Sequence, residues 1–229
     1  MITVSSTLVQ PSIPRSIPGT SSTGRFRNLA HRLRALSESS SASLSTVGVT
    51  SCARGEGVSA IAANLAVAAA EGVHRPVLLV DLNFANPAQA RIFGLTGNLG
   101  LRDALTAAAP LTDCPKATSI ANLSLLAPSA AHELDASTID PQQIRDMLDA
   151  LQPDYELIIV DLPPATEASP SVATAGSLSG VLLVLEAERT RCEVAERAMR
   201  RLENAQANVL GVVLNKRPEH IPAWLYKRL

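Results

Sequence analysis

Continuous runs of Leu, Ile and Val recur along the chain and alternate with longer segments in which apolar residues lie three or four positions apart. Continuous apolar runs are typical of strands buried on both faces of a parallel sheet, and the spaced pattern is typical of helices. The expected strands cover 46–50, 76–82, 122–127, 155–162, 179–187 and 207–216, and the expected helices cover 59–72, 141–152 and 191–205. This alternation predicts an α/β protein whose doubly wound, mostly parallel sheet is flanked by helices.

The first part of the chain departs from that alternation. Residues 1–24 are rich in Ser, Thr and Pro and poor in large apolar groups, so we expect them to form a flexible tail. Residues 25–36 place apolar groups at helical spacing beside four arginines, which predicts a basic amphipathic helix, with a serine-rich linker reaching residue 44. The basic face is either solvated or in contact with an acidic partner or an anionic membrane.

Composition narrows the class of protein. The 229 residues are 46% hydrophobic and 18% charged, which fits one globular domain. A formal net charge of −1 gives no overall field that would attract nucleic acid, so no such partner is expected. Cys52, Cys114 and Cys192 form no Cys-x-x-Cys pair, and we find neither a signal peptide nor an apolar run near the ~18 residues that span a bilayer. The expected location is the cytoplasm.

A glycine-rich turn joins the first core strand to the helix that follows it, in the sequence VTSCARGEGVSAIAANLA. In a strand, turn and helix of this kind, backbone N–H groups and the helix N-terminus converge on an anion. A working phosphate loop ends Gly-Lys-Ser/Thr, because the lysine reaches the β- and γ-phosphates and the hydroxyl binds Mg²⁺. The predicted nucleotide-binding residues are Arg54, Gly55, Glu56, Gly57, Val58, Ser59 and Ala60, with Val58 in place of the lysine.

Two acidic residues directly follow buried strands, Asp81 after the second and Asp161 after the fourth. Ligands of such sheets bind at the carboxyl ends of the strands, where this scaffold holds its metal and water. We therefore take Asp81 and Asp161 as candidate catalytic residues and, with Ser59, as candidate Mg²⁺ ligands. Each acid taken alone is also compatible with a helix cap or an ordinary loop carboxylate.

Five segments occur in the order of one family: SCARGEGVS, DLNFANP, IFGLTGNLGLRDAL, DLPP and GVVLNK. In this respect the chain resembles the bacterial tyrosine-kinase domain of polysaccharide co-polymerases, a relative of the ParA and MinD ATPases. The resemblance implies a P-loop NTPase domain over 45–217 with a C-terminal tail at 218–229, ATP or ADP and Mg²⁺ as cofactors, and a membrane polysaccharide co-polymerase as partner. That partner would place the protein at the inner membrane.

Four departures from the family pattern weaken the expected site. Val58 replaces the lysine, Asn83 replaces the second acid of a D-x-D pair, Ala85 replaces an arginine and Arg54 replaces a proline. A lost charge-assisted hydrogen bond contributes about 1.5–3 kcal/mol, so we expect nucleotide binding to be weak. Arg54 is either a solvated loop residue or a substitute for the missing lysine.

Three functions remain open on the sequence. The preferred one is a degenerate, kinase-like subunit that regulates or scaffolds exopolysaccharide or capsule assembly. The others are an active tyrosine autokinase and a ParA- or MinD-like positioning ATPase. The family's C-terminal tyrosine cluster is reduced to Tyr226, and its E-x-x-R-x-x-R ring motif falls on Asn28, His31 and Arg34, so self-association stays open.

Overall fold

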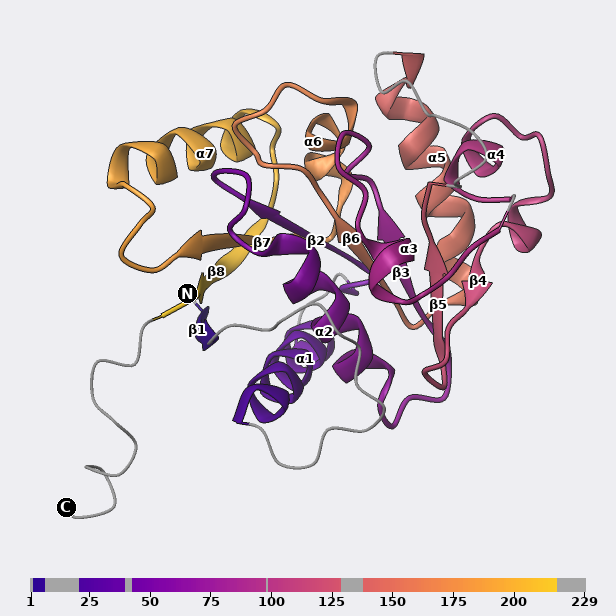
Figure 1. The fold of residues 1–229 in the computed structure, drawn as a ribbon, viewed down its shortest axis with the longest axis horizontal. Coiled ribbons are helices and arrows are strands. Elements are labelled where there is room, and N and C mark those ends of the chain that lie inside the picture. Colours follow the sequence, from indigo (N-terminus) through magenta and orange to yellow (C-terminus); the bar gives the residue numbers. More distant parts are fainter. Residues whose placement is uncertain (1, 7–20, 40–42, 98, 129–137, 218–229) are drawn as a thin grey trace.

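The computed structural model describes residues 2–6, 21–39, 43–97, 99–128 and 138–217 (Figure 1). Eight strands form one sheet in the order β1-β8-β7-β2-β6-β3-β5-β4. All neighbours pair in parallel except β4, which runs antiparallel to β5. The strands are β1 (Ile2–Ser6), β2 (Thr46–Ser51), β3 (Val77–Asp81), β4 (Lys116–Ala117), β5 (Leu123–Leu126), β6 (Leu157–Asp161), β7 (Gly180–Glu186) and β8 (Val209–Asn215).

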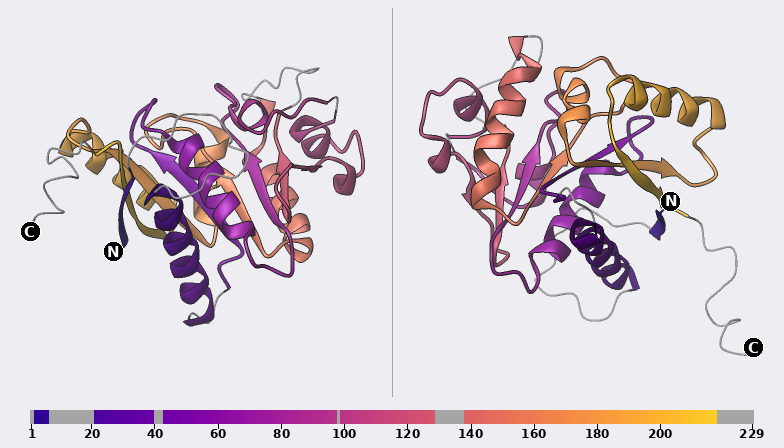
Figure 2. Two further views of the ribbon diagram at one scale, coloured as in Figure 1. Left: turned by 60° about the horizontal axis from the view of Figure 1, so that its bottom comes forward. Right: turned by 180° about the vertical axis from the view of Figure 1, so that it is seen from behind.

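Helices cover both faces of this sheet. The helices are α1 (Ser21–Ser39), α2 (Val58–Ala70), α3 (Gln89–Ile92), α4 (Leu101–Leu105), α5 (Pro141–Leu151), α6 (Pro170–Ala173) and α7 (Cys192–Asn204), with 3₁₀ turns at Leu111–Asp113, Gln152–Asp154 and Ala175–Ser177. The indigo and purple helices α1 and α2 lie on one side of the sheet, and α5, α6 and α7 lie on the other (Figures 1 and 2). The doubly wound arrangement predicted from the sequence is confirmed.

Alternate residues of the central strands feed two separate cores. In β3, Val77 and Leu79 pack with α1 and α2, whereas Leu78 and Val80 pack with α5. In β6, Ile159 faces the first core. Because successive side chains of a strand point to opposite faces, a strand covered on both sides needs apolar residues at every position. This requirement explains the continuous apolar runs in the sequence.

The parallel direction of the strands brings the ends of five of them to one edge of the sheet. The glycine-rich turn follows the carboxyl end of β2, so it also lies at this edge. Strand β2 itself sits in the middle of the sheet, between β6 and β7. Asp81 and Asp161 end β3 and β6, Glu186 ends β7, and Asn215 ends β8. Side chains from distant parts of the sequence therefore meet around the glycine-rich turn.

The predicted strands and long helices are all present, and one expectation is wrong. Residues 1–24 are not a tail throughout: β1 pairs with β8 over Ile2–Ser6, and α1 begins at Ser21. The β-branched residues of the sequence ITVSS favour a strand, and β8 offers it an open edge to pair with. The predicted tail at 218–229, with Tyr226, lies outside the described residues.

Candidate functional site

The glycine-rich turn keeps the backbone shape of an anion cradle. Gly55 and Gly57 have φ values of 85° and 91°, in the left-handed region that favours glycine. A Cβ at Gly57 would collide with the amide nitrogen of Asn215, which donates a 2.8 Å hydrogen bond to the carbonyl oxygen of Glu56. The turn thus requires glycine at position 57 for two independent reasons.

The N-terminus of α2 is open toward this turn. Gly57 is its N-cap residue, and no side chain caps the helix. The first N–H groups of a helix have no partner within it, and with the helix dipole they favour a bound anion. The backbone at Val58, Ser59 and Ala60 is thus oriented to bind phosphate oxygens.

Val58 provides no charged or hydrogen-bonding side-chain group to the site. Its side chain is 8% exposed and belongs to the core beneath α2. It therefore contributes packing at the position where a phosphate loop carries its cation.

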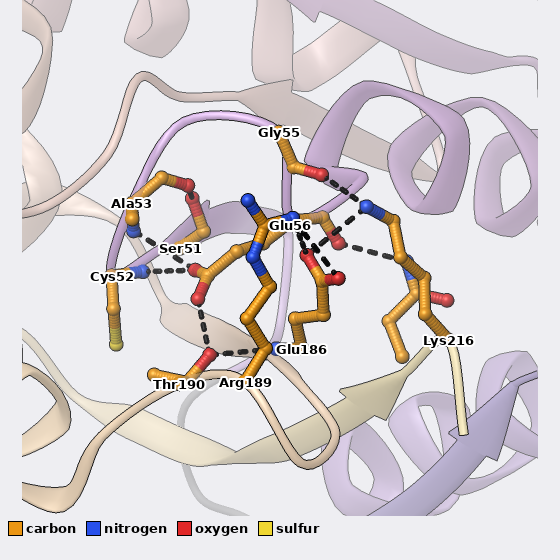
Figure 3. Close-up of polar contacts among 10 residues, drawn as sticks. Ser51, Cys52, Ala53, Gly55, Glu56, Glu186, Arg189, Thr190 and Lys216 are labelled. Atoms are coloured by element: carbon orange, nitrogen blue, oxygen red, sulfur yellow. Dashed lines mark hydrogen bonds and ion pairs between the residues drawn. The ribbon is translucent and has the colours of Figure 1, made fainter. Parts of the chain in front are cut away.

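Glu56 braces the turn from within. It is 4% exposed, and its Oε2 accepts hydrogen bonds from the backbone N–H groups of Cys52 (2.7 Å) and Ala53 (2.9 Å). Its other oxygen, Oε1, accepts a hydrogen bond from the Thr190 hydroxyl (Figure 3). A buried carboxylate needs partners of this kind to offset its lost hydration. Only the backbone of Glu56 is left to face a ligand, so its side chain is a structural element of the loop.

Arg54 is paired with an acid from another loop. Its Nε and Nη2 lie 2.5 and 3.0 Å from the two carboxylate oxygens of Glu167, which follows β6. The hydrogen bond from Arg54 lowers the pKa of Glu167. The Arg54 side chain is 64% exposed, so this pair is screened by solvent. In this structure Arg54 is a largely exposed loop residue whose guanidinium is bound to Glu167.

A second cation, Lys216, lies directly on the turn. Its Nζ donates to the carbonyl oxygen of Gly55 (2.6 Å) and lies 3.0 Å from Oε2 of Glu186 (Figure 3). Burial acts to raise the pKa of Glu186, but hydrogen bonds from Lys216 and Arg189 lower it overall. The ends of β7 and β8 thereby place a charged pair beside the glycine-rich turn.

The two predicted acids lie side by side, because Asp81 and Asp161 are register partners at the ends of β3 and β6. Asp81 accepts hydrogen bonds from the backbone N–H groups of Asn83 (3.1 Å), Ala88 (2.9 Å) and Gln89 (3.0 Å). The Gln89 amide joins Asp161 to the phosphate loop, since its Nε2 donates to Asp161 Oδ2 (2.7 Å) and to the carbonyl oxygen of Ser59 (3.0 Å).

Burial raises the pKa of both acids, to about 6 for Asp81 and about 8 for Asp161. The negative charge of Asp81 raises the pKa of Asp161 further, while Ser59 and Gln89 act in the opposite direction. Asp81 is the better ionised of the two because three backbone N–H groups stabilise its charge. Near neutral pH the pair therefore carries less negative charge than two separate carboxylates would.

Two buried oxygens of this cluster test whether a metal ion fits. Asp161 Oδ1 and Gln89 Oε1 have no hydrogen-bond partner within the described residues. Mg²⁺ prefers oxygen ligands, and unpartnered buried acceptors are costly without a donor or a cation. These oxygen donors suit a magnesium ion, which Asp161, with Asp81 and Ser59 beside it, would hold. When bound beside a nucleotide, such an ion neutralises charge on the phosphates.

The structure brings together the residues that the sequence predicted, since the turn at 54–60 and both acids lie at one sheet edge. Sequence reasoning did not single out the residues that hold the cluster together, which are Gln89, Glu167, Glu186, Thr190 and the pair at 215–216. The segment GVVLNK contains the last two, but they were expected only as part of the strand 207–216.

Comparison with known proteins agrees with this geometry. A model of the ParA family, described as a NUBPL iron-transfer P-loop NTPase, matches residues 44–222. The putative tyrosine-protein kinase CapB of Staphylococcus aureus is 28% identical over 170 residues, which cover 74% of this chain and 74% of that protein.

Solved structures give the same result. The crystal structure of the chimerical protein CapA2B2 superposes with a TM-score of 0.81 at 26% identity, over 94% of this chain and 93% of that one. The septum site-determining protein MinD of Pyrococcus horikoshii, complexed with Mg-ADP, gives 0.66 at 25% identity, over 80% and 76%. With a family model that spans most of its length and bacterial tyrosine kinases among its relatives, this chain belongs to the ParA family of P-loop NTPases.

Proposed function

We propose that this protein is a kinase-like subunit of an exopolysaccharide or capsule biosynthesis and export system. It binds ATP or ADP and Mg²⁺ weakly, and it regulates or scaffolds a membrane polysaccharide co-polymerase instead of transferring phosphate. That partner holds it at the cytoplasmic face of the inner membrane. Support comes from the similarity to the kinase CapB and to the CapA2B2 chimera. No helix within the described residues is both long and apolar enough to cross a bilayer.

One observation carries the proposal of weak binding. The residue at the lysine position, Val58, is buried in the core, while the loop backbone and the two acids around it are preserved. The arginine of the loop, Arg54, is engaged by Glu167. A scaffold that keeps its shape but not its central cation supports contact with partners better than phosphoryl transfer.

Nucleotide binding tests this proposal directly. We expect the purified protein to bind ATP with a Kd weaker than about 100 µM by calorimetry, because the charge-assisted hydrogen bond of a loop lysine is missing. Hydrolysis of ATP should not differ between the native protein and Asp161→Ala. Deletion of the gene should abolish polysaccharide export and leave cell division normal. A division defect with normal polysaccharide would instead indicate a MinD-like positioning role.

The second candidate is an active tyrosine autokinase, and the acid pair favours it. Asp81 and Asp161 lie side by side, and Oδ1 of Asp161, which has no hydrogen-bond partner among the described residues, suits a metal ion. Micromolar ATP binding together with hydrolysis that Asp161→Ala abolishes would establish this function and overturn the first.

A further inference from the structure

Lys216 is the more enclosed of two cations that border the glycine-rich turn. Arg54 is paired with Glu167, and its side chain is 64% exposed. The Lys216 side chain is only 28% exposed, and its ammonium rests on the carbonyl oxygen of Gly55 (Figure 3). We propose that Lys216, directly after β8, binds the phosphate groups of a nucleotide. It would thereby take the role of the loop lysine whose position Val58 occupies. This inference rests on the proposed function, in which the turn binds nucleotide weakly.

The backbone that carries Lys216 is fixed against the turn. Asn215, the last residue of β8, donates to the carbonyl oxygen of Glu56, and Lys216, which follows it, donates to that of Gly55, so two consecutive residues are tied to two consecutive residues of the loop. Lys216 has a φ of 53°, which is uncommon for a residue other than glycine. A left-handed lysine persists where its surroundings hold it, and such positions concentrate at functional sites.

The ammonium can change partners at low cost. A lysine ammonium has three N–H donors, and within the described residues Lys216 uses two of them, on Gly55 and Glu186. Glu186 is also bonded by Arg189, at 3.3 Å to each carboxylate oxygen. If Lys216 turns toward a phosphate, Glu186 therefore keeps a cationic neighbour. Phosphate oxygens carry more negative charge than the single carboxylate that Lys216 leaves, and its flexible stem permits the movement.

Glu186 accordingly competes with the ligand for Lys216. This carboxylate lies 3.0 Å from the ammonium, which also donates to the Gly55 carbonyl oxygen. Nucleotide binding would exchange the ion pair for contacts to phosphate. A cation that must first leave a carboxylate gives weaker binding than a lysine placed within the loop. The proposal thus explains how a weakened site retains some affinity for phosphate.

The experiment separates contact with phosphate from contact with the nucleobase. Lys216→Met is titrated by NMR with inorganic tripolyphosphate, with ATP and with adenosine. We expect the affinities for tripolyphosphate and ATP to fall together by about tenfold, the typical effect of one charge-assisted hydrogen bond, while adenosine binding stays within about twofold. Lys116→Met, the same substitution on β4 at the far edge of the sheet, serves as the matched control and should change none of the three.

Loss of adenosine affinity with unchanged tripolyphosphate binding would overturn the proposal, as would no loss at all. Glu186→Gln removes the competing carboxylate and should tighten tripolyphosphate binding, whereas Lys216→Arg should retain it; these two variants decide the question even if Lys216→Met folds poorly. Micromolar ATP binding with turnover would contradict the proposed function. The effect of Lys216→Met on tripolyphosphate affinity would still test the role of Lys216. If Val58→Lys tightened ATP binding and Lys216→Met had no effect, the inference about Lys216 would be refuted and the proposed function would stand.

Discussion

Val58 occupies the position at which a phosphate loop normally carries its lysine. The positive charges near the loop belong instead to neighbouring residues. Arg54 is paired with Glu167, and Lys216 shares Glu186 with Arg189, so each of these cations already has a carboxylate partner. A phosphate group must compete with these acids for a cation. The residues that differ from an active loop thus act by neutralising charge, while the backbone cradle is preserved.

Restoring the missing charge should restore affinity. The four-carbon stem of a lysine at position 58 can follow the apolar surface that Val58 now covers and place its ammonium at the cradle. We expect Val58→Lys to tighten ATP binding at least about tenfold in calorimetry. Val58→Met has similar bulk without charge and is the matched control. An equal effect of both variants would mean that packing, not charge, limits binding.

The acid pair makes a prediction about pH. Burial raises the pKa of Asp161 from 3.8 to about 8, so the folded protein holds a proton there that the unfolded chain releases above about pH 4. This contribution to stability is complete at low pH and is lost as pH rises through 8. In Asp161→Asn, which mimics the neutral acid, the metal-free unfolding free energy should therefore fall less between pH 5 and about 8.5.

Urea unfolding of the native protein and the variant in EDTA, at several pH values, measures this difference. Asp146→Asn on the exposed side of α5 is a suitable control, since its slope with pH should match that of the native protein. Parallel curves for Asp161→Asn and the native protein would contradict protonation of the buried pair.

At the scale of elements, α1 is joined to α2 by packing and by charge. Leu29 and Leu33 of α1 are buried against α2, Arg27 pairs with Glu71 at 2.5 Å, and Arg34 donates to the carbonyl oxygen of Ala69 at the end of α2. Cations at a helix C-terminus satisfy its last carbonyl groups. Two of the arginines predicted to line a solvated or partner-binding face therefore serve the fold itself.

The packing predicts a clear contrast within α1. Leu29→Ala should lower the free energy of unfolding by about 2–5 kcal/mol, because the side chain is fully buried and its removal leaves a cavity. Leu36→Ala, on the same helix but 37% exposed, should change it by less than about 1 kcal/mol. Chemical denaturation of the two variants provides the measurement, and a loss for Leu29→Ala as small as that expected for Leu36→Ala would show that α1 does not form part of the core.

Elements with a strong apolar pattern could be predicted from the sequence, and short or locally stabilised ones could not. The strands of the sheet interior and α2, α5 and α7 carry long periodic signals. In contrast, α3 and α4 have four and five residues, and β4 has two, so their stability comes from tertiary contacts that no local pattern records. The same limit applies to Gln89, whose role depends on Asp161, 72 positions away in the sequence.

The whole molecule is one sheet whose first strand in sequence is added at its edge. β1 pairs with β8 along its full length, although it precedes the rest of the domain in sequence. An uncovered edge strand offers unpaired N–H and C=O groups to other chains. β1 therefore covers the backbone edge of the longer strand β8 and leaves only a five-residue strand at this side of the sheet.

Removal of β1 should expose that edge. A protein that begins at Ser21 should keep its helices and central strands but associate as its concentration increases, measured by light scattering after gel filtration. Val4→Pro, which weakens the pairing without shortening the chain, should show an intermediate effect, because proline lacks the N–H that a ladder requires. A strictly monomeric truncated protein would contradict this role for β1.

The register between β1 and β8 extends as far as Ser6, which lies opposite Asn215, the residue whose amide fixes the glycine-rich turn. The outermost strand, β1, is thus the direct neighbour of β8, whose last residue contacts the glycine-rich turn. If neighbouring copies of the chain were to exchange their first strands, each copy would hold the loop of another in shape, and assembly would then be sensed at the phosphate site without any new contact there.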